Sequence, residues 1–295
     1  MKFMWFHLMP YQELPEDFKS KHKSVWVDLD STIFDPQKGH ILYNEYIDEL
    51  RFAADVGFDA VCVNEHHSNG YGLMPSPNLI ASALARETRD TAICVMGNSL
   101  ALYNPPPRVA EEMAMIDCIS GGRMIAGFPV GTPMDTCFAY GQNPAKLRPR
   151  YYEAIDFIQR AWTTDNTFSF NGRFNKQRYV NVWPRPIQKP HPPILLGGAT
   201  EHTLRRVVDF ADGWFPRGSK LSNPKSAMDQ LRHHADKAGR DFGSLAVTVF
   251  RGLPDEAYLE ECEAAGIYRV LLPLPSEDSD TVLPLLEKYE ALLAK

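Results

Sequence analysis

Eight short apolar runs recur along the whole chain and constrain its fold more than any other feature. They lie at residues 2–9, 59–64, 92–101, 123–130, 193–198, 212–216, 245–250 and 268–274. Within each run the apolar residues are mostly consecutive and do not alternate with polar ones. This pattern is typical of strands that are covered on both faces, as in a parallel sheet flanked by helices.

Helical patterns separate these runs. The segment 40–58 places Leu42, Tyr46 and Leu50 on one stripe, and Gly57 is a natural C-terminal stop. The other helical patterns lie at about 78–88, 107–123, 149–162, 201–210, 224–238, 255–265 and 280–294. Eight strands that are each followed by a helix predict an α/β fold, a (β/α)8 TIM barrel that forms a single domain over residues 1–295. The main alternative is an open doubly wound sheet, but no GxGxxG follows the first run.

The composition argues against several classes of partner. The chain has 295 residues, 44% of them hydrophobic, and a net charge of -6 without long runs of one sign. We therefore expect neither nucleic acid nor a membrane as a partner. The five cysteines form no CxxC pair, which predicts reduced thiols in a cytoplasmic protein. The start of the chain, MKFMWFHLMPY, lacks the features of a signal peptide and is expected to hold the first strand.

Two connections are longer than a plain barrel needs. Residues 10–40 form an extended loop after the first strand, on the side where barrel enzymes carry their active sites. Residues 163–192 separate the fourth helix from the fifth strand. There FSFNGRFN has Asn171-Gly172 between aromatic residues, which predicts a β-hairpin insertion.

The segment VNEHHSNGYGLMPSP at the end of the second run concentrates polar groups. Adjacent strand residues point to opposite sides, so the His66 and His67 rings are not expected to converge on one metal ion. No HExxH or CxxC is present, and we expect no metal. Two interpretations remain: one histidine serves as an acid or base, or the segment is only a hydrogen-bonded strand end with Glu65 holding a ring.

Other strand ends carry further candidates. Gly197, Gly198, Ala199 and Thr200 follow a strand and open a helix, a place where free N–H groups can hold a phosphate, although such glycines also serve ordinary turns. The segment 127–141 could wrap a planar ligand or form a tight loop. Trp214 could wall an apolar pocket, but an aromatic stripe is more often plain core.

Several segments together resemble the bacterial luciferase-like flavin monooxygenases. These are MKFMWFHLMPY, GFDAVCVNEHHSNGYGLMPSPN, PPPRVAEEMAMIDCISGGRMIAGFPVG, RYYEAIDFIQRAW and PPILLGGATEHTLRRVVDFADGWFP, and the ending EAAGIYRVLLPL fits the family's last strand. The resemblance runs from residue 1 to about 216.

The resemblance implies roles for individual residues. His66 matches the active-site histidine beside the flavin, with Asn64 and Glu65 positioning it. The flavin is expected to contact Asn98, Ser99, Leu100, Val130, Arg150 and the Gly197–Thr200 turn, with a cis peptide bond at Ser99–Leu100. The substrate pocket is expected to include His7, Tyr71, Phe128, Trp214 and Phe215.

The sequence also departs from luciferase itself, which has a cysteine and a phosphate-binding arginine after the fourth strand. Pro129 and Val130 stand there instead, so light emission is not expected. The charge that neutralises the phosphate must come from another group, and the candidates are Arg148, Arg150, His202 and Arg217.

The implied activity is that of a two-component monooxygenase. Reduced FMN from a separate flavin reductase and molecular oxygen would form a C4a-hydroperoxyflavin that oxygenates a small apolar substrate. The segment GGATEHTLRRVVDFADGWFPRG also resembles the deazaflavin branch, so a deazaflavin-dependent hydride-transfer oxidoreductase is the alternative. A third possibility is a paralogue that binds flavin without turnover. A homodimer is expected, with Met113 and Ile116 either on the dimer face or in a packed helix.

Overall fold

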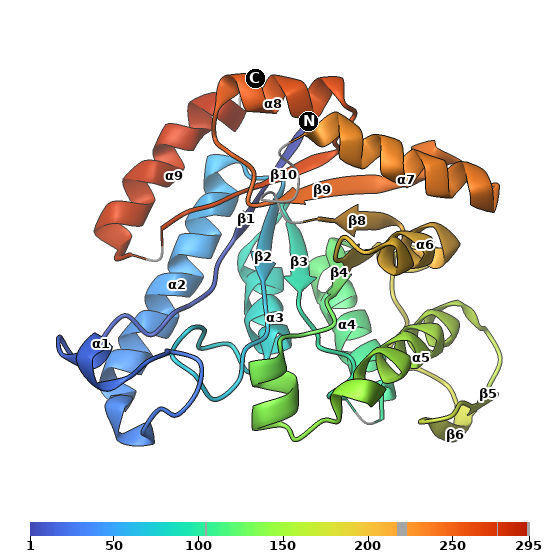
Figure 1. Cartoon of the computed structure of the whole chain (residues 1–295), viewed down its shortest axis with the longest axis horizontal. Coiled ribbons are helices and arrows are strands. Elements are labelled where there is room, and N and C mark those ends of the chain that lie inside the picture. Colours follow the sequence, from blue (N-terminus) through green and yellow to red (C-terminus); the bar gives the residue numbers. More distant parts are fainter. Residues whose placement is uncertain (104, 217–222, 276, 294–295) are drawn as a thin grey trace.

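Eight parallel strands close into a barrel in the order β1, β10, β9, β8, β7, β4, β3, β2 (Figure 1). The computed structural model describes residues 1–103, 105–216, 223–275 and 277–293. The barrel strands are β1 (Lys2–Phe6), β2 (Ala60–Val63), β3 (Ala92–Met96), β4 (Met124–Phe128), β7 (Ile194–Gly197), β8 (Gly213–Phe215), β9 (Ala246–Phe250) and β10 (Arg269–Leu272). The predicted (β/α)8 barrel is therefore confirmed.

Helices surround the barrel at the places that the sequence pattern indicates. They are α2 (Pro36–Val56), α3 (Pro77–Glu87), α4 (Pro107–Ser120), α5 (Pro144–Thr163), α6 (Glu201–Phe210), α7 (Pro224–Ala238), α8 (Glu256–Ala264) and α9 (Ser279–Leu293). Shorter turns are α1 (Phe18–Lys21), η1 (Ser31–Ile33), the π-helical η2 (Met134–Ala139) and η4 (Phe242–Ser244).

Capping residues explain the ends of these helices. Asp35 accepts hydrogen bonds from the first turn of α2, and Gly57 ends that helix with a φ of 110°. On α4, Met113 and Ile116 are fully buried, so of the two interpretations of this stripe the packed helix is right.

The barrel interior is filled by small and soft side chains, among them Met4, Cys62, Cys94 and Leu271. Every second residue of a strand points inward, which explains why members on the same strand, such as Ala60 and Cys62 on β2, are two residues apart. The Phe6 and Phe250 rings meet edge to face at 5.1 Å, and both pack against this interior cluster. A larger apolar core lies between the sheet and the helices.

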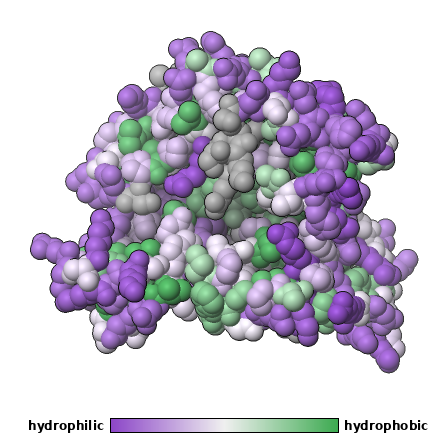
Figure 2. Space-filling model, viewed as in Figure 1, coloured by the Kyte–Doolittle hydropathy of each residue, from purple (hydrophilic) through white to green (hydrophobic). Residues whose placement is uncertain are grey.

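The long loop after β1 folds onto the segment that follows β2. The Tyr11 N–H donates to the Gly70 carbonyl, and the Gly70 N–H donates to the Val25 carbonyl, both at 3.0 Å. In Figure 1 this loop, with α1, lies at the lower left, below the barrel strands. The space-filling view from the same side shows a hollow between the barrel and these loops, bordered by hydrophobic side chains (Figure 2).

The predicted hairpin is also present. It consists of β5 (Phe168–Asn171) and β6 (Lys176–Val180), which pair antiparallel. The carboxylate of Glu153 on α5 accepts the N–H groups of Arg173, Phe174 and Asn175 at 2.6–2.9 Å. A Cβ on Gly172 would lie 2.4 Å from this carboxylate, so a larger residue there would displace the Glu153 side chain from its present position.

Among the described residues, no helix has both the length and the apolar content needed to cross a membrane.

Candidate functional site

His66 is held by a carboxylate that lies far away in the sequence. Its Nδ1 is 2.9 Å from Oδ2 of Asp135, the second residue of η2. The same carboxylate accepts the His67 N–H at 2.9 Å and the Asn69 side-chain amide at 3.1 Å, and Thr132 donates its hydroxyl at 2.9 Å. Asp135 is almost fully buried. A π-helix is rare and is often found at functional sites, which fits this position.

The charge state of this pair can be inferred from the surroundings of Asp135. Burial acts to raise the pKa of the carboxyl, but the hydrogen bonds from His66 and the His67 N–H outweigh it and hold the pKa below its ordinary value. Asp135 is therefore a carboxylate that can only accept, so Nδ1 of His66 carries the proton. No contact to a described residue occupies Nε2, which leaves this nitrogen free for chemistry.

Two aromatic rings enclose His66. Trp26, from the loop after β1, meets the imidazole edge to face at 4.9 Å and stacks on Tyr71 at 3.9 Å. Tyr71 meets His66 edge to face at 5.0 Å. Of the expected pocket residues, Tyr71 thus lies directly against the histidine. Trp26 is a residue that the sequence interpretation missed.

Glu65 contacts the other histidine. Its Oε1 is 2.7 Å from Nε2 of His67, and its Oε2 accepts the Ser99 N–H and the Tyr103 hydroxyl, both at 3.0 Å. The Tyr103 oxygen in turn accepts the Asn98 side-chain amide at 3.0 Å. Burial raises the pKa of Tyr103, so its hydroxyl keeps its proton. The expectation that Glu65 positions the catalytic histidine does not match this geometry, because Glu65 instead links the ends of β2 and β3.

Two buried acceptors lie without a donor at these strand ends. The side-chain carbonyl oxygens of Asn64 and Asn98 have no hydrogen-bond partner among the described residues. Both side chains are buried, and each residue continues the every-second-residue series of its strand that faces the barrel interior. A buried acceptor without a donor is costly, so this pair suits a ligand that carries N–H groups.

The turn after β7 has the features of an anion site. Gly198 adopts a φ of 112°, and Thr200 caps the first turn of α6 by accepting the Thr203 N–H. A Cβ on Gly197 would lie 2.5 Å from the Phe215 ring, so a larger residue there would have to displace this ring. The exposed turn leads into the positive end of the α6 dipole, which favours a phosphate.

The residues expected to neutralise a bound phosphate differ in their surroundings. Arg150 donates to Gln142 at 2.6 Å and borders a small cavity next to Leu100 and Tyr103. His202 packs edge to face on Tyr152 at 5.1 Å.

The other residues expected to contact the flavin or to neutralise its phosphate are Arg148, Arg217 and Val130. Arg148 lies exposed on α5, and Arg217 lies outside the described residues. Val130 is half-buried against the outer core, next to Gly131.

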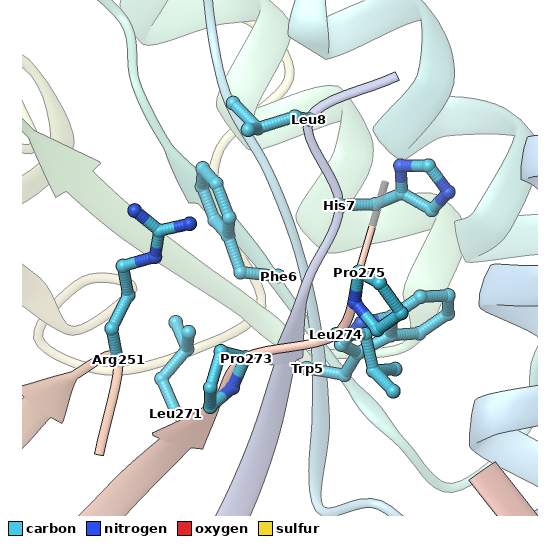
Figure 3. A pocket seen from close by; sticks show the side chains of 9 residues that line it. All are labelled: Trp5, Phe6, His7, Leu8, Arg251, Leu271, Pro273, Leu274 and Pro275. Atoms are coloured by element: carbon cyan, nitrogen blue, oxygen red, sulfur yellow. The ribbon is translucent and has the colours of Figure 1, made fainter. Parts of the chain in front are cut away.

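A small cavity, partly open to solvent, lies at the ends of β1, β9 and β10 (Figure 3). Apolar side chains such as Trp5, Phe6 and Leu271 line it, together with His7 and Arg251. Both ring nitrogens of His7 are occupied. Nδ1 accepts the Met9 N–H at 2.8 Å, and Nε2 lies 2.9 Å from the Glu49 carboxylate.

The other expected pocket residues do not line this cavity. Phe128 is fully buried, and its carbonyl accepts the Tyr151 hydroxyl. Trp214 is buried and donates its indole N–H to the Gly198 carbonyl at 2.6 Å, so it supports the turn after β7. Phe215 packs on Gly197.

The expected cis peptide bond at Ser99–Leu100 is wrong. The cis bonds of the described chain both precede proline, at Trp183–Pro184 and Lys189–Pro190. The Ser99 carbonyl accepts the Leu102 N–H at 2.8 Å, so this segment forms an ordinary turn with its backbone groups satisfied. Among the described residues, no three His, Cys, Asp or Glu side chains are grouped so that they could hold a metal ion.

Several curated proteins are related to this chain in sequence. The flavin-dependent trigonelline monooxygenase, oxygenase component, of Acinetobacter baylyi is 30% identical over 227 residues, which are 75% of this chain and 61% of the relative. The chain spans about half to two-thirds of the length of such curated relatives.

Solved structures share the fold at lower identity. The oxygenating constituent of 3,6-diketocamphane monooxygenase from Pseudomonas putida, in complex with FMN, aligns with a TM-score of 0.75 at 15% identity over 100% of this chain and 98% of that chain. An F420-dependent secondary alcohol dehydrogenase in complex with an F420–acetone adduct aligns with a TM-score of 0.74 at 15% identity over 98% of this chain and 97% of that one.

The family model described as luciferase-like monooxygenase matches residues 29–261. Because this match covers well over half of the chain, the protein belongs to the luciferase-like monooxygenase family.

Proposed function

We propose that the protein is a flavin-dependent monooxygenase that uses reduced FMN and molecular oxygen to oxygenate a small apolar molecule. The observation that carries the proposal is the His66–Asp135 pair, a buried imidazole with one nitrogen fixed by a carboxylate and the other left free. It lies at the carboxyl end of the barrel strands, where enzymes of this fold carry their chemistry.

The residues at the barrel mouth fit FMN. The Gly197–Thr200 turn offers N–H groups and a helix dipole to the phosphate. The unpartnered oxygens of Asn64 and Asn98 are acceptors suited to the N–H of a flavin ring. Phe215 supplies an apolar surface beside the turn. When bound, reduced FMN supplies the electrons that activate oxygen.

His66 controls a proton in this proposal. Because Nδ1 donates to Asp135, Nε2 presents a lone pair that can take up a proton and return it. The carboxylate stabilises the imidazolium that results, as in other histidine–aspartate pairs. Asp135 is thus a positioning residue that fixes the tautomer and orientation of the ring.

Trp26 and Tyr71 exclude water from this nitrogen. Their rings cover His66 from the loop after β1 and from the segment after β2. Oxygen chemistry of this kind needs a dry site, because water and stray protons divert the oxidising equivalent to hydrogen peroxide. The loop is therefore the proposed cover of the site.

The partners follow from the same chemistry. A separate flavin reductase supplies the reduced FMN, since no nicotinamide-binding GxGxxG follows the first strand. A homodimer is proposed as the assembled form. The alternative reaction is hydride transfer with a deazaflavin on the same barrel.

Anaerobic titration tests the choice of cofactor. We expect reduced FMN to bind at least about 10-fold tighter than reduced riboflavin, because only FMN places a phosphate on the turn after β7. A deazaflavin is expected to bind more weakly than FMN. Equal binding of FMN and riboflavin, or a clear preference for the deazaflavin, would contradict the proposal.

A further inference from the structure

The side chain of Asn98 is buried at the end of β3, and only one of its two polar ends has a partner. Its Nδ2 donates to the Tyr103 hydroxyl at 3.0 Å, whereas its Oδ1 has no partner among the described residues. The residue is 0% exposed. An amide can exchange the places of its oxygen and nitrogen by rotating about χ2, so its surroundings decide which of the two faces a ligand.

The hydrogen bonds of Glu65 fix this choice. Its Oε2 accepts the Ser99 N–H, which can only donate, and the Tyr103 hydroxyl, both at 3.0 Å. Because Tyr103 gives its single proton to Glu65, the phenol oxygen can only accept from Asn98. The amide must therefore turn its NH2 group toward Tyr103 and its carbonyl oxygen away. A flipped amide would place two acceptors against each other, which is costly in a buried site.

Two further features keep this arrangement in place. Burial and the neighbouring Glu65 carboxylate raise the pKa of Tyr103, so the phenol holds the proton that it donates. Gly97 lets the ends of β2 and β3 approach closely, because a Cβ there would lie 2.8 Å from the Glu65 backbone nitrogen. The hydrogen-bonded chain from Glu65 through Tyr103 to Asn98 thus connects two strand ends that are tightly packed.

We propose that Glu65 and Tyr103 are positioning residues that hold the Asn98 carbonyl oxygen as a fixed acceptor for an N–H of the bound flavin ring. Asn98 continues the series of Cys94 and Met96 that faces the barrel interior. An acceptor that cannot flip favours a ring position that carries hydrogen and disfavours one that carries a lone pair. The assignment rests on the proposed use of a flavin.

Anaerobic binding titrations of the intact chain test this assignment. The probes are the reduced forms of FMN, of 3-methyl-FMN, which lacks the imide N–H, and of 5-deaza-FMN, in which a carbon replaces the N5 nitrogen. The variants are Tyr103→Phe, which removes only the hydroxyl, Asn98→Ala and the double variant. Tyr289→Phe is the matched control, since this half-buried tyrosine on α9 also donates its hydroxyl to an acceptor, the Pro273 carbonyl at 3.4 Å.

We expect the unmodified protein to bind at least one of the two modified flavins about 10-fold more weakly than FMN, because one ring N–H is missing. Tyr103→Phe should reduce this preference to about 2- to 3-fold, since the amide is then free to flip, and Asn98→Ala should abolish it. Tyr103→Phe should have no further effect in the Asn98→Ala protein, because it acts through the amide. Tyr289→Phe should keep the full preference.

The amide itself gives a readout that needs no ligand. In protein labelled with nitrogen-15 at asparagine, the side-chain signal that is missing from Asn98→Ala belongs to Asn98. Hydrogen exchange of this amide should be at least about 10-fold faster in Tyr103→Phe than in the unmodified protein, because its hydrogen bond is lost. Exchange should be unchanged in Tyr289→Phe.

Two results would overturn the assignment. One is a preference for FMN over the modified flavins that is absent from the unmodified protein or survives in full in Tyr103→Phe. The other is unchanged exchange of the Asn98 amide in Tyr103→Phe. If none of the three flavins binds, the proposed flavin function fails, while the amide exchange still shows whether Tyr103 orients Asn98, so the two failures can be told apart.

Discussion

At His66 the 2.9 Å contact between Nδ1 and Asp135 decides what the imidazole can do. The neighbouring His67 is equally buried, but its Nε2 is occupied by Glu65 at 2.7 Å. Two adjacent histidines therefore have different environments. In each ring one nitrogen is held by a carboxylate, and the other has no hydrogen bond to a described residue. His66 differs from His67 in that Trp26 and Tyr71 pack against its ring.

Replacement of Asp135 tests this positioning role. An Asp135→Asn protein loaded with reduced FMN should release hydrogen peroxide about 10- to 100-fold faster after mixing with oxygen, because the amide no longer fixes the His66 tautomer. FMN affinity should change little. His67→Gln is the control, since it alters the other histidine and should leave peroxide release within about 2-fold.

The stability of the site should depend on pH in a defined direction. The pKa of Asp135 is lowered below its ordinary value of 3.8, so the carboxylate contributes stability that is complete above this pH. That contribution is lost as the pH falls through the folded-state pKa. The difference in unfolding free energy between the unmodified protein and Asp135→Asn, measured by urea denaturation, should therefore shrink as the pH falls below about 4. A difference that stays constant or grows below about pH 4 would contradict this assignment.

The sequence points to His66 but not to its partner. The pattern of a buried strand followed by polar residues is local, and it locates Asn64–His67 at the barrel mouth. Asp135 lies 69 residues away, and only the closure of the barrel and the turn of η2 bring it to the ring. The contacts of Glu65 depend in the same way on Tyr103, which no local pattern links to it.

Among the elements, the loop after β1 is the proposed cover of the site, and Trp26 is the residue through which it acts. A Trp26→Ala protein should bind FMN but release hydrogen peroxide several-fold faster, because water then reaches His66. Val27→Ala is the matched control, since Val27 is the next residue of the loop and is 36% exposed. Peroxide release from Trp26→Ala at the rate of the unmodified protein would argue against the loop as the cover.

The hairpin depends on a single side chain of α5. Glu153→Gln should destabilise the protein by about 1–2 kcal/mol, because the amide replaces a carboxylate that accepts three backbone N–H groups of the turn. Hydrogen exchange should increase at residues 173–175. Glu111→Gln, at an exposed position of α4, should leave both measurements unchanged.

Element positions follow closely from the sequence, and the differences have local causes. The Asn171-Gly172 hairpin and the Gly57 helix stop are present as expected. Helix α5 begins at Pro144 and not at Pro149, because Asn143 caps the first turn before the internal proline is reached. The strands are shorter than the apolar runs, since residues such as Asn98 and Ser99 bond to side chains and leave the ladder.

For the whole molecule, the alternation of eight strands and helices is enough to predict the barrel, because few folds cover both faces of so many consecutive apolar strands. The placement of the loops across the mouth is not predictable in the same way. It depends on contacts such as that of Gly70 with Val25, which join segments distant in the sequence. This explains why the pocket expected around Phe128 and Trp214 differs from the cavity beside Arg251.

The fate of oxygen in the FMN-loaded protein tests the central claim most directly. The protein is loaded anaerobically with reduced FMN and mixed with oxygen, and hydrogen peroxide is followed against free reduced FMN. The enclosed site with its His66–Asp135 pair predicts peroxide release that is slower than from free flavin by about 10-fold or more, and faster again in His66→Ala. Release at the rate of free reduced FMN, unchanged by His66→Ala, would contradict the proposed monooxygenase.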